Sequence, residues 1–233
     1  MTASEAELSP VVNIVGEHIA LGPLCRDLIP DYRRWGNDFP TARTQGGAPR
    51  PWTTERVVSW FEQATANERA TWFTIYQRAT WRPIGTTHLK DLHWRNRTAE
   101  FGVAIGEADA RGRGYGTETA RLMLDYAFAA LGLHNVMLTV YSFNIGGRRA
   151  YEKAGFREFG RRRQCDRMGG ALWDVVYMDC LASEFASPLL HTIFAPDVPF
   201  ASFCNWGSGA DGAGEYNHDS GAIVRLGCTG GAN

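Results

Sequence analysis

One stretch, residues 98–128, constrains the fold of this chain most, because a strand, a glycine-rich turn and an amphipathic helix follow one another in it. The turn reads RGRGYGT from Arg111 to Thr117, with a glycine at every second position. Glycines let the backbone approach a ligand without a Cβ in the way. The start of the following helix offers unpaired N–H groups and the positive end of its dipole. The stretch therefore predicts an anion cradle, most naturally for a pyrophosphate.

Two other phosphate-binding loops do not fit this turn. Its pattern is G-x-G-x-G rather than the G-x-G-x-x-G of dinucleotide-binding domains, and no acidic residue ends a strand about 20 residues further on. The turn also has no G-K-[ST], so it is not a nucleoside triphosphate loop.

The strand before the turn, Thr98–Gly106, carries a single carboxylate beside small residues. Alternation places Glu100, Gly102 and Ala104 on one face and three apolar side chains on the other. Glu100 therefore has room beside it for a reacting group, although a merely solvated carboxylate fits the pattern equally well. After the turn, apolar residues recur at helical spacing as far as Leu131 and predict a core-facing helix.

Elsewhere the chain alternates between predicted strands and helices, which indicates an α+β or α/β fold with helices packed on a sheet. Strands are predicted at residues 11–21, 70–77, 84–89, 136–141, 156–163 and 172–181, and helices at 24–35, 54–64 and 144–154. Residues 37–51 read as a long loop of the kind that often forms a lid or a binding element. We expect a disordered lead-in over residues 1–10 and a largely disordered Gly-, Ser- and Asp-rich tail over 186–233.

Composition excludes several classes of function. The 233 residues carry a net charge of −1, so no global field favours nucleic acid or an anionic membrane. Five scattered cysteines without a C-x-x-C pair argue against a disulfide framework or a zinc site, and no histidine pair has metal-ligand spacing. Without a signal peptide or a long apolar run, a cytoplasmic protein without metal or membrane partners is expected. Arg161–Arg163 with Arg167 form a basic run, which fits either a solvated strand edge or an acidic or RNA ligand.

Two motifs in order resemble the GNAT N-acetyltransferases, and most closely their RimJ/RimL-like branch. Residues 111–118 (RGRGYGTE) are similar to the R/Q-x-x-G-x-G/A loop that binds the acyl-CoA pyrophosphate, and residues 99–105 to the strand before it. Residues 144–156 (NIGGRRAYEKAGF) resemble the N-x-x-S-x-R-x-Y-E-K-x-G-F signature, with Gly147 in place of the usual Ser or Ala. Asp174 matches an aspartate common in the last strand of the family. The resemblance covers residues 11–182.

The resemblance implies an acetyltransferase domain over residues 11–185 with acetyl-CoA as its acyl donor. Its fold would be a mixed, mostly antiparallel twisted sheet of about seven strands, flanked by helices and splayed at the acyl-CoA site. The pantetheine arm would pair with the backbone of Val103, Ala104 and Ile105, and Asn144, which can also cap a helix, would contact that arm. The pyrophosphate would lie on the turn, formed by Arg111, Gly112, Arg113, Gly114, Tyr115, Gly116 and Thr117.

Acyl transfer to an amine requires loss of an ammonium proton, a stabilised oxyanion and protonation of the leaving thiolate. Glu100 is the candidate base, acting through water, and a backbone N–H near Val103 is the candidate oxyanion donor. Tyr151 matches the tyrosine that protonates the thiolate, although a core-facing aromatic residue is the other interpretation. Direct transfer to a primary amine of a protein N-terminus, a metabolite or an antibiotic is expected, in a monomer or homodimer. Another donor such as succinyl-CoA, or a non-catalytic CoA- or partner-binding module, is the alternative.

Overall fold

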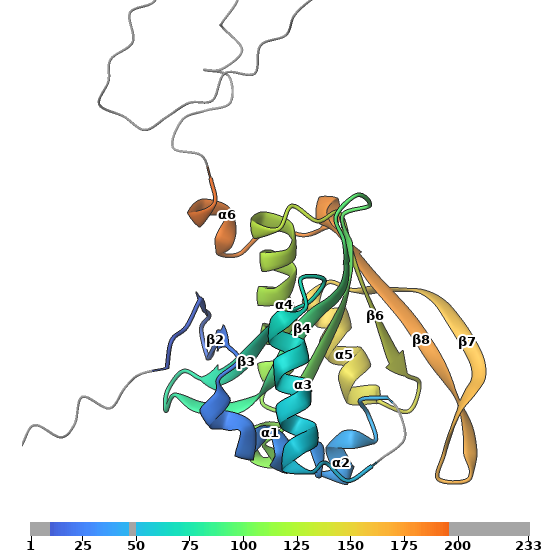
Figure 1. The fold of residues 1–233 in the computed structure, drawn as a ribbon. Helices are drawn as coiled ribbons and strands as arrows, with labels where there is room; N and C mark the ends of the chain where they lie inside the picture. Colours follow the sequence, from blue (N-terminus) through green and yellow to red (C-terminus); the bar gives the residue numbers. More distant parts are fainter. Residues whose placement is uncertain (1–9, 47–49, 196–233) are drawn as a thin grey trace, which may run out of the picture. The chain divides into compact units, whose positions relative to one another are not determined.

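The computed structural model describes residues 10–46 and 50–195, and its centre is an eight-stranded sheet in the order β1-β2-β3-β4-β5-β6-β8-β7 (Figure 1). Neighbouring strands run antiparallel except β5 and β6, which are parallel. The predicted mixed, mostly antiparallel sheet is thus confirmed. The strands are β1 Ile14–Val15, β2 Ile19–Pro23, β3 Thr71–Gln77, β4 Arg82–His93, β5 Thr98–Ile105, β6 Asn135–Tyr141, β7 Arg157–Met168 and β8 Ala171–Leu181.

The eighth strand comes from a turn at Gly16. The sequence predicts one strand over residues 11–21, but the Gly16 N–H bonds the carbonyl of Ile19 and closes a tight turn between β1 and β2. A Cβ at Gly16 would lie 2.4 Å from a carboxylate oxygen of Glu118, so the turn has no space for a side chain. Strands β4 and β7 also run longer than predicted, to His93 and Met168.

Helices cover the two faces of the sheet as separate pairs. On one face α1 packs against α3 around Tyr32, Trp35 and Phe61, and Trp60 of α3 meets Trp72 of β3. On the other face α4 and α5 pack on the main core, which includes Phe101 and Phe156. The helices are α1 Ile29–Gly36, α2 Phe39–Ala42, α3 Thr54–Ala66, α4 Tyr115–Asp125, α5 Ile145–Ala154 and α6 Leu190–Ile193, with a π-helical turn at Tyr126–Ala130.

Two helices lie where the sequence predicts irregular chain. The short helix α2 occupies part of the predicted loop 37–51, and α6 lies within the predicted tail. The buried carboxylate of Asp125 on α4 accepts the backbone N–H groups of Leu189 and Leu190, at 3.0 and 2.8 Å, and holds α6 against the domain. The predictions for residues 1–9 and 196–233 lie outside the described residues.

The parallel pair β5–β6 creates the one break in the sheet that the site uses. The two strands pair only at Thr98–Asn135, Ala99–Val136 and Glu100–Met137. Beyond Glu100, β5 continues to pair with β4 but no longer with β6. One edge of β5 is therefore left without a neighbouring strand at Val103–Ile105.

Candidate active site

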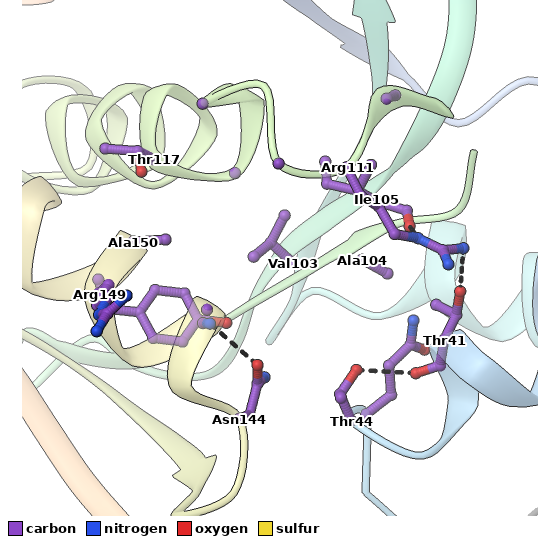
Figure 2. A pocket seen from close by; sticks show the side chains of 18 of the residues that line it. Thr41, Thr44, Val103, Ala104, Ile105, Arg111, Thr117, Asn144, Arg149 and Ala150 are labelled. Carbon is purple, nitrogen blue, oxygen red and sulfur yellow. Dashed lines mark hydrogen bonds between the residues drawn. The ribbon is translucent and has the colours of Figure 1, made fainter. Parts of the chain in front are cut away.

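A cavity of about 570 Å³ opens beside the free edge of β5. The end of β5, the glycine turn, the start of α5 and the segment that carries α2 form its walls (Figure 2). Among the predicted site residues, those that line it are Val103, Ala104, Ile105, Arg111, Gly112, Gly114, Gly116, Thr117, Asn144 and Tyr151. Three predicted residues, Glu100, Arg113 and Tyr115, are not part of its lining.

The glycine turn presents bare backbone to the cavity. Gly112 and Gly114 have φ angles of +72° and +87°, which other residues rarely adopt. A Cβ at Gly112, Gly114 or Gly116 would meet no atom within 4 Å, so crowding by the protein does not explain these glycines. Gly114 begins α4 and offers no side chain to cap it. The first N–H groups of α4 therefore have no side-chain cap and face open space.

Arg111 ties the glycine turn to neighbouring chain segments. Its guanidinium donates to the carboxylate of Asp38 at 2.6 Å, to the hydroxyl of Thr41, and to the carbonyls of Ile105 and Gly106 at 3.0 and 2.8 Å. The carboxylate of Asp38 is also bonded by Thr41, and this bond, followed by that from Arg111, lowers the pKa of Asp38. Arg111 thus joins the turn, the end of β5 and α2.

A buried carboxylate fixes α1 to the end of β5 next to this junction. Glu107 accepts from Arg34 and Arg82, each at 2.5 Å, and from the indole N–H of Trp35 at 2.7 Å. Burial alone would raise its pKa, but these three donors outweigh burial and lower it. The side chain of Glu107 is 8% exposed, so the two arginines neutralise a charge that is almost fully removed from water.

Asn144 begins α5 at the opposite wall. Its side-chain oxygen accepts the N–H of Gly147 at 3.0 Å, as expected of an N-cap residue. A Cβ at Gly147 would lie 2.5 Å from the amide nitrogen of Asn144, so the Ser or Ala of the resembling motif would require the Asn144 side chain to shift.

Tyr151 lies about two turns further along α5, partly buried between Phe101 and Phe156. Its hydroxyl makes no hydrogen bond to any other residue that the structure describes. Burial raises its pKa to about 12. The phenol therefore stays protonated at neutral pH and is able to donate a proton into the cavity.

Glu100 lies outside the cavity lining. It sits across from Lys90 in the β4–β5 ladder, and its carboxylate is 3.1 Å from the Lys90 ammonium. Arg113 is exposed, and the Tyr115 hydroxyl accepts a hydrogen bond from Gln77. Each of these three residues contacts a neighbouring side chain or solvent and lies outside the cavity lining. The role expected of each would therefore require bound substrate.

Sequence reasoning missed several polar residues of the cavity, among them Thr41, Arg43, Thr44, Arg149 and Lys153. Arg149 and Lys153 lie one turn apart on α5, and neither forms an ion pair with a described residue. Helical spacing predicts that they share a face, but nothing in the spacing identifies which face meets a ligand. The other three belong to the loop that the sequence marks as a candidate binding element without a residue-level signal.

In this chain a glycine turn at a helix start lies beside a cavity where β5 and β6 stop pairing. This arrangement is typical of α+β acetyltransferases. The model of the GNAT acetyltransferase domain matches residues 18–157, and this chain belongs to that family. Probable N-acetyltransferase YjcK of Bacillus subtilis (strain 168) is 33% identical over 121 residues, which cover 52% of this chain and 65% of YjcK. Spermidine N(1)-acetyltransferase of Vibrio cholerae is 31% identical over 102 residues, which cover 44% of this chain and 58% of that relative. The matched segment thus spans less than two thirds of both relatives.

Solved structures share the fold at lower identity. Spermidine N-acetyltransferase from Vibrio cholerae, in complex with CoA and spermine, superposes with a TM-score of 0.67 at 23% identity. The superposition covers 72% of this chain and 98% of that one.

The described residues hold neither a candidate metal site nor a membrane-spanning helix. Within 10–46 and 50–195, no group of three His, Cys, Asp or Glu side chains is placed to hold a metal ion. No helix in the same ranges has the length and apolar character needed to cross a membrane.

Proposed function

We propose that this chain is a RimJ/RimL-like N-acetyltransferase of the cytoplasm, which moves the acetyl group of acetyl-CoA directly to a primary amine in a ternary complex. One observation supports it most: a single cavity joins the uncapped start of α4, the free edge of β5 and the hydroxyl-bearing face of α5. Pyrophosphate, pantetheine and thioester require these three surfaces in that order. Membership of the GNAT family agrees with it.

The residues present fit acetyl-CoA. Backbone N–H groups at Gly112–Gly116 suit the pyrophosphate. Arg149 and Lys153 on α5, which form no ion pair with a described residue, supply cations for the phosphates. Val103 keeps backbone groups free for an amide of the pantetheine arm, while the Ile105 carbonyl already accepts from Arg111. Acetyl-CoA supplies an acetyl group activated as a thioester.

The chemical roles follow from protonation states. Tyr151, with its raised pKa, donates the proton that the leaving thiolate takes. Glu100 accepts the ammonium proton through water, which requires its carboxylate to exchange the Lys90 contact for that water. A backbone N–H at Val103 stabilises the oxyanion.

The test is a free-thiol release assay with acetyl-CoA and a panel of amines, peptides and aminoglycoside antibiotics, run in parallel with succinyl-CoA. We expect acetyl-CoA to release thiol only in the presence of an amine. Acetyl-CoA binding, measured by calorimetry, without release for any amine would instead establish a non-catalytic binding module. Preferential release from succinyl-CoA would overturn the acetyl assignment.

Matched variants test the catalytic roles. Tyr151→Phe and Glu100→Gln are expected to lower kcat with acetyl-CoA affinity retained. Tyr177→Phe on β8 and Glu55→Gln at the exposed start of α3 serve as controls, because neither lines the cavity. Unchanged turnover in both Tyr151→Phe and Glu100→Gln would remove this catalytic assignment.

We also propose residues 11–185 as the acetyltransferase domain, in a monomer or homodimer. The family match over 18–157 lies within these bounds, and β8 ends at Leu181. Light scattering of the full chain measures the oligomeric state, and a larger assembly would contradict the proposal.

A further inference from the structure

The cavity has a strongly one-sided charge. Among the residues that the structure describes, its lining includes four basic side chains, Arg43, Arg111, Arg149 and Lys153, and no acidic one. Residues 47–49, which follow the lining segment, are Gly, Ala and Pro and add no charge. A ligand that enters this cavity therefore meets a positive field.

Two carboxylates close to lining residues, Asp38 and Glu100, already have cationic partners. Asp38 is bonded by Arg111 at 2.6 Å and by Thr41, and Glu100 lies 3.1 Å from Lys90. Neither carboxylate is free to bind a second cation without giving up its partner. An acceptor with several ammonium groups, such as spermidine, would leave its additional charges unpaired here, which disfavours it.

Three of the four cations, all but Arg111, which is paired with Asp38, divide between two sides of the cavity. Arg149 and Lys153 lie on α5, which packs beside α4 on the face where the glycine turn would hold the CoA phosphates. Arg43 directly follows α2, and Figure 2 shows its neighbours Thr41 and Thr44 across the cavity from Thr117 at the start of α4. Arg43 is therefore placed away from the phosphates, on the side from which an acceptor would approach.

An aromatic surface orients Arg43. Its guanidinium carbon lies 5.9 Å from the centre of the Phe143 ring, which stacks on Tyr141 and contacts Trp173 edge-on. No described carboxylate forms an ion pair with Arg43. A guanidinium beside an aromatic ring keeps N–H groups for other partners, and its planar fork matches a carboxylate in two parallel hydrogen bonds.

We propose that the acceptor carries a carboxylate close to its primary amine, and that Arg43 binds this carboxylate. The inference rests on the proposed acetyltransferase function and narrows its substrate class. A free amino acid and a peptide N-terminus followed by Asp or Glu share the required chemistry. A polyamine does not.

The experiment measures CoA release by the full chain with matched pairs of acceptors. One arm uses ω-amino carboxylates of increasing length against their amides, and a second uses peptides with Asp or Glu at the second position against Asn or Gln. Spermidine is the polycationic comparison. We expect kcat/KM to be at least ~10-fold higher for the carboxylate member in one of the two arms, and spermidine to be the poorer acceptor.

Variants of Arg43 link the preference to this side chain. Arg43→Ala should bring the carboxylate-to-amide ratio to about one, and Arg43→Glu should invert it, through acceptor KM and with acetyl-CoA KM changed less than ~2-fold. Arg121→Glu makes the same change in net charge at an exposed position on α4 outside the lining, and should keep the wild-type ratio.

Three results would overturn the inference while leaving the acetyltransferase function intact: equal or better turnover of spermidine, a carboxylate preference that survives in Arg43→Ala, or a rise in acetyl-CoA KM in Arg43→Glu. Failure of every amine tested to release thiol, despite confirmed acetyl-CoA binding, would instead refute the proposed function and the inference with it.

Discussion

The guanidinium of Arg111 lies 2.6 Å from the carboxylate of Asp38, 73 residues away in the chain, and connects the glycine turn to α2. The two walls of the cavity that would face the donor and the acceptor are thereby joined through one ion pair. Both side chains are about one third exposed (33% and 32%), so water weakens the pair only in part.

Removing this pair should loosen α2, on the side of the cavity where an acceptor would bind, more than the glycine turn on the side of the donor. In a double-mutant cycle of Arg111→Ala and Asp38→Ala, we expect a coupling of about 1 kcal/mol in urea unfolding, because the pair is only partly screened. Asp38→Ala should raise acceptor KM with little effect on acetyl-CoA KM. The pair Arg26–Glu62, with both side chains 59% exposed, is the control and should show negligible coupling. A cycle at Arg111–Asp38 as weak as the control would show that the pair does not hold the wall.

Glu107→Gln should destabilise the fold, because it leaves Arg34 and Arg82 without their shared buried carboxylate. We expect a loss of about 2 kcal/mol in urea unfolding, below the range for fully buried pairs because both arginines are half exposed. Asp109→Asn, which removes an exposed partner of Arg82, should leave the unfolding midpoint unchanged. Equal effects of the two substitutions would contradict the importance of the buried carboxylate.

Tyr151→Phe should reduce kcat by roughly 10²-fold, the lower end of what general acid catalysis contributes. The fold should be retained, because the ring contacts with Phe101 and Phe156 do not involve the hydroxyl. Since the pKa of Tyr151 is raised to about 12, its ionisation should cause no fall in wild-type kcat between pH 7 and 10. A basic limb in that range that disappears in Tyr151→Phe would show that the phenol ionises far more easily than its burial indicates.

His88 should make the fold sensitive to acid. It packs against Trp72 with ring centres 4.1 Å apart and ring planes tilted by 33°, and burial, followed by the charge of Lys90, lowers its pKa to about 4. The unfolded chain binds this proton near pH 6.5, so stability is full above that value and is lost as the pH falls toward 4. We expect His88 to account for about 2 kcal/mol of that loss.

The measurement for His88 is urea unfolding between pH 7 and 4. His88→Phe keeps a ring beside Trp72 but cannot take up a proton, so its stability should fall less steeply than that of the wild type. His93→Phe is the matched control, because His93 is exposed at the end of β4 and should keep the wild-type slope. Parallel curves for the wild type and His88→Phe would contradict the prediction.

Elements with local signals were predictable. Thr53 caps α3, Asn144 caps α5 and Gly155, with φ of +117°, ends α5, each by a backbone rule that acts within a few residues. A run of aromatic and β-branched residues identified β3, and an apolar run identified β6, for the same reason. The sequence marks Gly16 as an interruption of the first strand but not as a turn between two strands, because the side chain of Glu118 that packs there lies about 100 residues away.

The site divides in the same way. The glycine turn and the edge of β5 follow from spacing and family motifs, and most of these residues line the cavity. Arg43 could not be found from spacing, because whether an arginine faces solvent or a cavity depends on tertiary packing. Arg149 and Lys153 are the R and the K of the signature at residues 144–156, but the motif was not used to assign them to the site. The partner of Arg111 was also beyond reach, since the family motif associates this arginine with phosphate while the fold gives it Asp38.

The short parallel pair between β5 and β6 makes the cavity a seam between two halves of the chain. The β5 edge and the glycine turn precede residue 131, whereas β6 and α5 follow residue 134, and only three residue pairs join β5 to β6. A ligand bound across this seam would stabilise the folded chain, because it binds the joined halves and not the separated ones. By mass action the free energy of unfolding would then rise with the concentration of that ligand, so a low supply of the donor would increase the unfolded fraction.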